Sequence, residues 1–560
     1  MLRSDVFFRA CLVSSWAAAL GFAGTGCSSD PEGEDESSSS VGSLSASETG
    51  DDGADASTTG SGTSDSGGME GGNPDDGVYA ADISIDQIEF NQGTGTIVAQ
   101  GGQELAPSSY SAPLVGGRPA LVRVGVSIGA GFEAREIVAR LTLVHTDGTF
   151  HELEDSIVVS SDSDMRLYDG AFAIELPADA LRGGDRFVVG LFESDESLPG
   201  ASTPARVPAA GDADLGVWGD PMTAKVVVLP ANDPAVDSSA HQLTDAMKAM
   251  LEADLYNLYP VQNIEVIYHE PVTITGCTDG ANILAQVSGY RNSEGYGANV
   301  YYHAIFQNSH ENYCWAGGMA WLEDTSQGAD RVSYSVNHWG ESPNNWTHEL
   351  GHSHGRPHSF EDTDSYEPNA YPGPDCGHRS TNGYALIPYQ HPKYVEWNYA
   401  PMATMDDWII APTEGLALNG YCEGHPNFDA WGPAMQDVMS YAYPYWISAY
   451  TYRNLASHIR TTSAWGDQVP PPLGSTLHVV ELGDGRLVSY EIAGAPEFSE
   501  DAVQYEATLT SPDGERFTAR ARPKLDGEGR AHGHIVHMPA GLTEPVSIEV
   551  NGQQRTLRSI

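Results

Sequence analysis

Apolar and polar residues alternate in short runs through residues 78–216, for example at 120–126 and 137–143. Turn-forming residues such as Gly116 and Gly117 separate these runs. Successive side chains of a strand point to opposite faces of its sheet, so the alternation is typical of strands with one buried face. The pattern predicts an all-β domain over residues 78–216, and its short, regularly spaced strands favour a sandwich.

Past this region the pattern changes to longer elements. An apolar run at 225–229 predicts a buried strand, and 264–267 predicts another. The segment between them, 238–259, has apolar residues at the spacing of one helical face: Leu243, Met247, Met250, Leu251, Leu255 and Leu258. A helix near 282–291 and a strand at 300–306 continue the series, and this alternation of strands and helices predicts an α/β arrangement.

Short alternating runs return from about residue 470, as at 476–482 and 546–550. They predict a small C-terminal β domain over residues 470–560. A chain of 560 residues exceeds what one hydrophobic core usually organises. We therefore expect a multidomain protein, in which an α/β domain at 217–461 is flanked by an N-terminal β-sandwich and the small C-terminal β domain.

The N-terminal segment 1–27 has the pattern of a secretory signal, because arginines precede an apolar run at 10–23 that ends in small residues. Cys27 follows Gly24-Thr25-Gly26, which resembles a bacterial lipoprotein cleavage site and predicts a lipid on Cys27. We expect an exported protein of the cell surface or outer membrane, with ordinary secretion as the alternative. Any membrane contact is expected only through this anchor, since no later stretch reaches the roughly 18 apolar residues of a span.

Residues 28–77 are rich in Ser, Gly and acidic residues and have almost no apolar ones, so they predict a disordered linker. The whole chain has a formal net charge of −50. Nucleic-acid binders need clustered Lys and Arg, so this charge argues against a nucleic-acid partner. The charge is compatible with bound calcium, but no EF-hand or glycine-aspartate repeat supports it. The oligomeric state is not predicted.

Cys277, Cys314, Cys376 and Cys422 form an even set in a chain expected to enter an oxidising compartment. Three pairings are possible. We favour Cys277 with Cys314 and Cys376 with Cys422, because each pair closes a short stretch on one side of the histidine motif described next. A cysteine zinc site is a competing interpretation, but the close C-x-x-C spacing of such sites does not occur.

The sequence H-E-x-x-H-x-x-G-x-x-H begins at His348. His348 and His352 are four residues apart, so a helix places both imidazoles on one face, where a single zinc ion can bridge them. Gly355 can adopt the positive φ that ends a helix, which lets the chain return His358 to the same ion as third ligand.

Three neutral imidazoles leave one coordination position open, and a water bound there ionises near pH 7. Glu349 lies beside the ligands and is placed to take the proton of that water as general base. We therefore expect a zinc-dependent endopeptidase that hydrolyses extracellular proteins and carries one catalytic zinc ion. The alternative function is a surface binding protein or adhesin that keeps the same body without turnover.

Different ligand sets remain open. A structural zinc site would be closed by a fourth protein ligand, and the histidines could also be coincidental and bind no metal. His354 could replace His358 as third ligand. A site of the thermolysin kind would instead take a downstream glutamate, Glu361 or Glu367.

The extended histidine motif resembles that of the metzincin metalloproteases, whose second signature is a tight turn with a methionine beneath the zinc. Residues 437–441, Asp-Val-Met-Ser-Tyr, resemble that turn. The resemblance implies that Met439 is the apolar floor of the site. It also implies that Tyr441 reaches the zinc or the oxyanion of the transition state.

Residues 315–321 lie where metzincins place the edge strand that pairs with an extended substrate. There Gly317 and Gly318 would admit a peptide backbone, and Met319 and Ala320 would offer hydrogen bonds. The whole arrangement looks most like bacterial surface metzincins related to the mucin-cleaving enterobacterial proteases, which implies a protein or glycoprotein substrate.

Overall fold

The computed structural model describes residues 75–165, 170–236, 242–308, 314, 317–338, 345–358, 384–388, 403–405, 408–412, 436–439, 445–447, 449–465, 474–498 and 503–560. These ranges all fall within one compact unit, residues 67–560. The predicted signal and most of the linker lie outside them, as do Cys27, Cys376, Cys422 and Tyr441. No helix within the described ranges combines the length and the apolar character that crossing a membrane requires.

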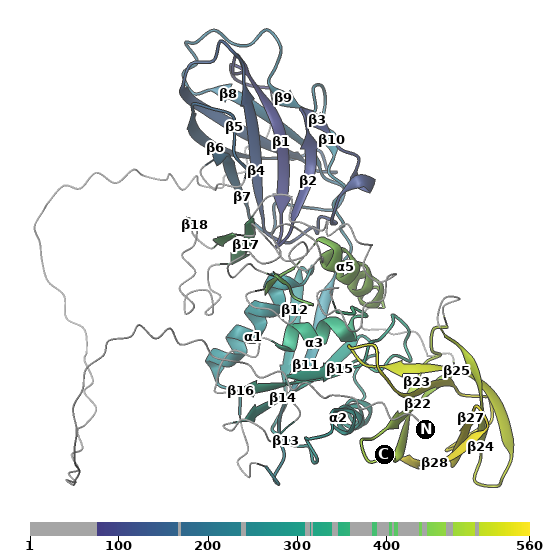
Figure 1. Ribbon diagram of the computed structural model, residues 1–560. Coiled ribbons are helices and arrows are strands. Elements are labelled where there is room, and N and C mark those ends of the chain that lie inside the picture. Colours follow the sequence, from purple (N-terminus) through teal and green to yellow (C-terminus); the bar gives the residue numbers. More distant parts are fainter. Residues whose placement is uncertain are drawn as a thin grey trace, which may run out of the picture. The chain divides into compact units, whose positions relative to one another are not determined.

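Two sheets that share one hydrophobic core form the N-terminal domain, in agreement with the predicted sandwich (Figure 1). The first has the order β3-β2-β1-β4-β7, with bounds Gln103–Glu104, Gly95–Gln100, Ile83–Asn91, Ala120–Ile128 and Phe172–Leu176. The second has the order β10-β8-β5-β6 with β9 beside β8, with bounds Ala213–Asp214, Arg186–Glu193, Arg135–Val144, Phe150–Val159 and Arg206–Val207. A short 3₁₀ turn, η1, spans Pro107–Ser109.

The central sheet has the order β12-β11-β14-β16-β15, with β13 beside β11. The bounds are Asn263–Tyr268, Thr223–Asn232, Val300–Asn308, Val332–His338, Gly318–Ala320 and, for β13, Val272–Thr273. Neighbouring strands are parallel from β12 to β16, whereas β15 runs antiparallel to β16. Strand β15 therefore ends the sheet with reversed direction.

Helices cover both faces of this sheet: α1 (Asp245–Leu258), α2 (Gly280–Glu294), α3 (Asn345–Ser353) and α5 (Ala449–Ser463). Val226 of β11 packs in one cluster with α1, α3 and α5, and its neighbour Val227 packs in another with α2. This explains the continuous apolar run at 225–229, because a strand covered on both faces has no exposed side. The run of strands and helices over residues 225–306 matches the sequence prediction, whereas α5 was not predicted.

Two polar side chains fix where the first helices begin. Thr244 accepts a hydrogen bond from the Met247 backbone N–H at the start of α1, and Asp279 accepts one from Asn282 at the start of α2. These caps satisfy N–H groups that have no partner within the helix. Just before α2, Cys277 forms a disulfide with Cys314, which is the first of the two predicted pairings.

The C-terminal strands close into a barrel, β22-β23-β28-β27-β24-β25-β26. The bounds are Ser475–Glu481, Leu487–Ala493, Gln553–Ser559, Ser547–Val550, Tyr505–Thr510, Arg516–Leu525 and Ala531–His537. The barrel has its own apolar core, but Val480 and Tyr490 instead belong to the cluster that also contains Val227 and Tyr302 of the central sheet. The barrel is therefore packed onto the central sheet.

Smaller elements complete the described chain. Strands β17 (Tyr384–Pro388), β19 (Trp408–Pro412) and β18 (Ala403–Met405) form one sheet, and β20 (Gln436–Asp437) pairs with β21 (Tyr445–Trp446). The structure is thus β-rich, with several sheets and its helices gathered around the central one. This agrees with the predicted multidomain organisation and with β domains on both sides of a mixed centre.

A buried histidine in β14 gives the central sheet a pH-dependent stability. The two ring nitrogens of His303 lie 2.7 Å from the Ser333 hydroxyl and 2.9 Å from the Ser335 hydroxyl, both on β16. Burial lowers the pKa of His303 to about 3. Between this value and the ordinary value near 6.5, only the unfolded chain binds the proton, so stability falls as the pH falls.

We predict that His303→Gln reduces this loss. Between pH 6 and pH 4 the free energy of unfolding should fall less steeply in the variant, by up to about 1.4 kcal/mol per pH unit. Denaturant unfolding at several pH values measures the slope. Replacing the exposed His537 by Gln is the control, and equal slopes in both variants and the parent would contradict the prediction.

Candidate metal centre

Three histidines of the motif meet at one point. The Nε2 atoms of His348 and His352 lie 3.0 Å apart, and the Nε2 of His358 lies 3.0 Å from the first and 3.1 Å from the second. All three residues are buried. Helix α3 supplies the first two from successive turns, as their spacing predicts.

The partners of the outer ring nitrogens decide where the protons are. The Nδ1–H of His348 donates to the Val438 carbonyl (2.7 Å), and that of His352 donates to the Arg356 carbonyl (2.5 Å). A carbonyl only accepts, so both Nδ1 atoms carry protons, and in a neutral ring the Nε2 is then bare. Burial lowers the pKa of His348 to about 4 and of His358 to about 2, and lowers the pKa of His352 well below its usual value.

Ring nitrogens that carry no proton and face one another can together bind a cation. Neutral imidazole is a common zinc ligand, and a metal-bound histidine usually donates its other N–H to a carbonyl or carboxylate. His348 and His352 have such carbonyl partners. The Nδ1 of His358 lies 3.8 Å from a carboxylate oxygen of Glu528. Among the described residues, these three imidazoles therefore fit one zinc ion.

The turn after α3 returns His358 to the other two histidines. Gly355 has φ +76°, its N–H donates to the His352 carbonyl, and the Arg356 N–H donates to the Gly351 carbonyl. This pair of hydrogen bonds is the Schellman arrangement, which a residue with positive φ makes possible. A Cβ on Gly355 would also come within 2.7 Å of the Glu323 carbonyl oxygen. The predicted conformation of Gly355 is thus present, and close packing is a second reason for glycine.

The predicted methionine turn lies under the same helix. Met439 is buried, and a Cβ built on Gly351 of α3 would lie 2.3 Å from its sulfur. The neighbouring Val438 supplies the carbonyl that orients His348. Met439 therefore packs against α3, and its role as the apolar floor of the site stays a prediction, while Tyr441 lies outside the described residues.

His354 points away from the three converging rings. Its Nδ1 lies 2.7 Å from the Leu350 carbonyl, and its ring stacks on Tyr301 with centroids 3.9 Å apart. This packing favours His358 over His354 as the third ligand. Glu361 and Glu367, either of which could complete a site of the thermolysin kind, lie outside the described part of the chain.

Glu349 lies beside the histidines and against β15. A Cβ on Gly318 would be 2.5 Å from a carboxylate oxygen of Glu349 and 2.7 Å from the Tyr334 carbonyl, so position 318 has no space for a side chain. Burial, followed by the nearby carboxylates of Glu528 and Asp526, raises the pKa of Glu349 well above its ordinary value. A cation held by the histidines would lower this pKa again, since an opposite charge favours the ionised form.

In the predicted substrate strand, some backbone groups face β16 and others face the open edge of the sheet. The Gly317 carbonyl accepts from Val336 and the Trp321 N–H donates to Val332, so both face β16. Backbone groups alternate along a strand, so Gly318 and Ala320 face the open edge and Met319 faces β16. Gly318 and Ala320 therefore direct their backbone groups to this edge, where the Ala320 carbonyl already accepts from the Gly527 N–H. The sequence had suggested Met319 and Ala320 instead.

A cavity of about 640 Å³ opens beside the histidines and is lined by Glu349, β15 and the turn between β25 and β26 of the barrel. The sequence did not suggest that this turn, residues 525–531, takes part. A Cβ on Gly527 would lie 2.5 Å from the Nε2 of His352, and Glu528 faces His358. The sequence of residues 526–530 is that of an ordinary hairpin turn. The residues of such a turn do not indicate which distant part of the chain it contacts.

Comparisons with known proteins give no family. No protein-family model and no curated protein matches the chain. A calcium-binding mutant of β-glucuronidase 2 from Bacteroides uniformis is similar at 10% identity over 41% of this chain and 25% of that one, with a TM-score of 0.16. A protein described as a β-galactosidase from Bacteroides fragilis is similar at 9% identity over 85% and 73% of the two chains, with a TM-score of 0.14.

The chain spans only a quarter of the length of the glucuronidase. Likenesses of this size carry no argument about fold or activity. The functional assignment therefore depends on the residues of this chain alone.

We predict that the zinc content of variants distinguishes the three proposed ligands from the nearby His354. His348→Ala, His352→Ala and His358→Ala should each lose stoichiometric zinc, because two imidazoles remain where three are needed. His354→Gln should keep one zinc ion per chain. Elemental analysis of the folded, dialysed variants measures this, and zinc retained by His358→Ala but lost by His354→Gln would contradict the ligand set.

Proposed function

We propose that this protein is a zinc-dependent peptidase of the metzincin type. The observation that carries the proposal is the convergence of the Nε2 atoms of three buried histidines beside the carboxylate of Glu349 at the wall of a cavity. A structural zinc site would need a fourth protein ligand and has no use for this carboxylate. The arrangement is instead suited to hydrolysis.

Each residue has a defined part in that chemistry. A zinc ion on the three histidines would supply Lewis-acid activation of a water molecule and of the substrate carbonyl. Glu349 accepts the proton of the attacking water and passes it to the leaving amine. Its burial against Gly318 holds the carboxylate in one place, and the outward-facing backbone of Gly318 is positioned to bind an extended peptide as an added strand.

The metzincin assignment is supported by features beyond the motif. The turn at Gly355 brings back the third histidine, Met439 lies beneath α3, and β15 forms an edge strand of reversed direction beside the site. These features agree with what the resemblance implies for an α/β catalytic domain at residues 217–461. We also propose that the protein is exported, as a surface lipoprotein or a secreted protein, and the disulfide Cys277–Cys314 supports an oxidising compartment.

Hydrolysis of unfolded casein by the purified 78–560 fragment tests the proposal. Release of new amino groups should require zinc and should fall by roughly 10²–10⁴-fold in Glu349→Gln, because general-base catalysis is lost. The variant should keep its zinc. Hydrolysis that survives chelation or the substitution would contradict the mechanism. Zinc-loaded protein without any hydrolysis would favour the surface binding protein or adhesin instead.

A second substitution tests the contact between the base and the edge strand. In Gly318→Ala the new methyl group would displace the Glu349 carboxylate, and a misplacement of about 1 Å can cost about 100-fold in rate. Zinc content should not change, because no ligand is touched. Casein hydrolysis and zinc analysis measure the two effects, with Gly289→Ala in α2 as the control, since Gly289 lies within a helix and a Cβ there meets nothing within 4 Å. An unaltered rate would show that Glu349 does not act from this position.

A further inference from the structure

The turn between β25 and β26 already pairs with the open edge of β15. The Leu322 N–H donates to the Leu525 carbonyl (3.0 Å), and the Gly527 N–H donates to the Ala320 carbonyl (3.1 Å). Trp321 and Asp526 form an antiparallel bridge between these bonds. The barrel thus occupies the edge from Ala320 onward, and Gly318 is the next outward-facing residue before it.

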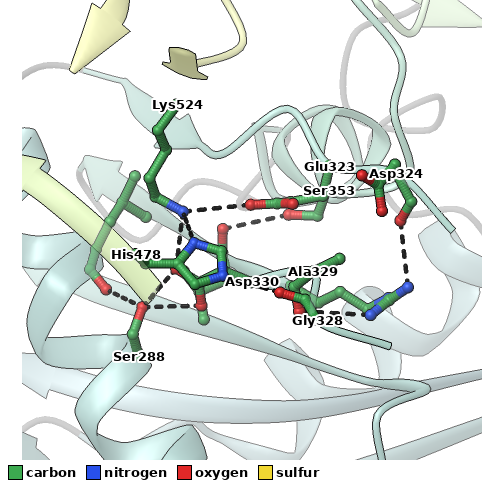
Figure 2. Close-up of polar contacts among 12 residues, drawn as sticks. Ser288, Glu323, Asp324, Gly328, Ala329, Asp330, Ser353, His478 and Lys524 are labelled. Carbon is green, nitrogen blue, oxygen red and sulfur yellow. Dashed lines mark hydrogen bonds and ion pairs between the residues drawn. The ribbon is translucent and has the colours of Figure 1, made fainter. Parts of the chain in front are cut away.

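A buried lysine fixes the base of this turn. The ammonium of Lys524, which has no exposed surface, lies 3.1 Å from Asp330, 3.3 Å from Glu323 and 3.0 Å from the Nδ1 of His478 (Figure 2). An ammonium has three N–H donors, so all three are satisfied. The Nε2–H of His478 donates in turn to the Gly328 carbonyl (2.8 Å).

The same cluster contains a second set of residues of the types that bind metals. Glu323, Asp330 and His478 are close enough together to share a cation, but the ammonium of Lys524 is the cation they hold. Removing one partner of such a buried network leaves an uncompensated charge, so the network strongly resists opening. Together with the apolar core shared by the barrel and the central sheet, this network holds the turn in place as a wall of the cavity.

The direction of this wall determines which side of a substrate it blocks. Along the turn, residue 525 lies opposite 322, 526 opposite 321 and 527 opposite 320, so its chain runs antiparallel to β15. A substrate that continues this antiparallel line at Gly318 would have its N-terminal end against Gly527. Both the general base and the histidines lie at this junction, since Glu349 abuts Gly318 and His352 abuts Gly527.

The chemistry of the closed end suits an amino terminus. Asp526 and Glu528 line the cavity beside Gly527, and Asp279 at the start of α2 is also part of the cavity wall. Asp526 is bound to His532 (2.7 Å), while Glu528 lies 3.8 Å from His358 and 3.4 Å from Arg530, whose side chain is 67% exposed. A carboxyl terminus would be repelled by these groups, whereas an ammonium group would be attracted, as the net charge of −50 also favours.

We propose that the substrate is a peptide with a free amino terminus and that the bond cleaved lies one or two residues from it. This inference rests on the proposed zinc peptidase and narrows its substrate class. The barrel turn ends the strand-binding edge, and Glu528 binds the ammonium group of the substrate. An ammonium group could also come from a lysine side chain near the cleaved bond, and the experiment distinguishes this source from the amino terminus.

Paired peptides of about ten residues test the proposal, each with a free or an acetylated amino terminus and with or without an internal lysine. Mass spectrometry of early products should find loss of one or two N-terminal residues, at least tenfold faster from the free peptides. Glu528→Gln should lower kcat/KM for the free peptides about tenfold and keep its zinc, because the amide oxygen can still face the Nδ1 of His358. The matched control is Glu549→Gln, a barrel glutamate that is paired with Arg516 (2.6 Å) and is not part of the cavity wall.

The outcomes separate this inference from the function it rests on. Internal cleavage of acetylated and free peptides at equal rates would overturn the inference, while Glu349-dependent casein hydrolysis would still support the peptidase. Preference for an internal lysine regardless of acetylation would assign Glu528 to a side chain and would overturn the terminal assignment. Absence of all hydrolysis by zinc-loaded protein would overturn both.

Discussion

The Nε2 atoms of three buried histidines lie within 3.1 Å of one another, and a shared cation would stabilise this arrangement. Gathering polar ring nitrogens in a buried site is costly, so the surrounding elements must hold them in place. Two backbone carbonyls fix the tautomers of His348 and His352, and a positive-φ glycine returns the third ring. Binding of an ion here would therefore be coupled to the folding of this region.

The site draws on segments far apart in the sequence. Helix α3 brings two of the proposed ligands and the proposed base. Val438 orients His348, and the barrel places Gly527 against His352. Because the barrel is held by a buried lysine and by a core shared with the central sheet, it is part of the cleft. In this account, the histidine motif determines the chemistry, whereas the barrel limits which peptides can reach it.

The sequence predicted the features that depend on local spacing. Histidines four apart on a helix, a glycine at the helix end and apolar runs of period two all follow from backbone geometry, and the structure contains them. It did not predict closure of the barrel or the position of the turn at Gly527. Both features depend on which distant strands pair with each other. The alternation of apolar and polar residues indicates that a strand exists, but it does not indicate which strand lies beside it. The sequence also could not show which residues of β15 face outward. Met319 and Ala320 are neighbours whose backbone groups point to opposite edges, and only the observed register with β16 tells them apart.

X-ray absorption at the zinc edge of the purified protein tests the central claim most directly. We predict three nitrogen neighbours of imidazole type at about 2.0–2.1 Å and one oxygen from a ligand other than the protein. Four protein ligands, or sulfur neighbours at about 2.3 Å, would instead indicate a structural or cysteine-based site. Protein that binds no zinc would contradict the account altogether.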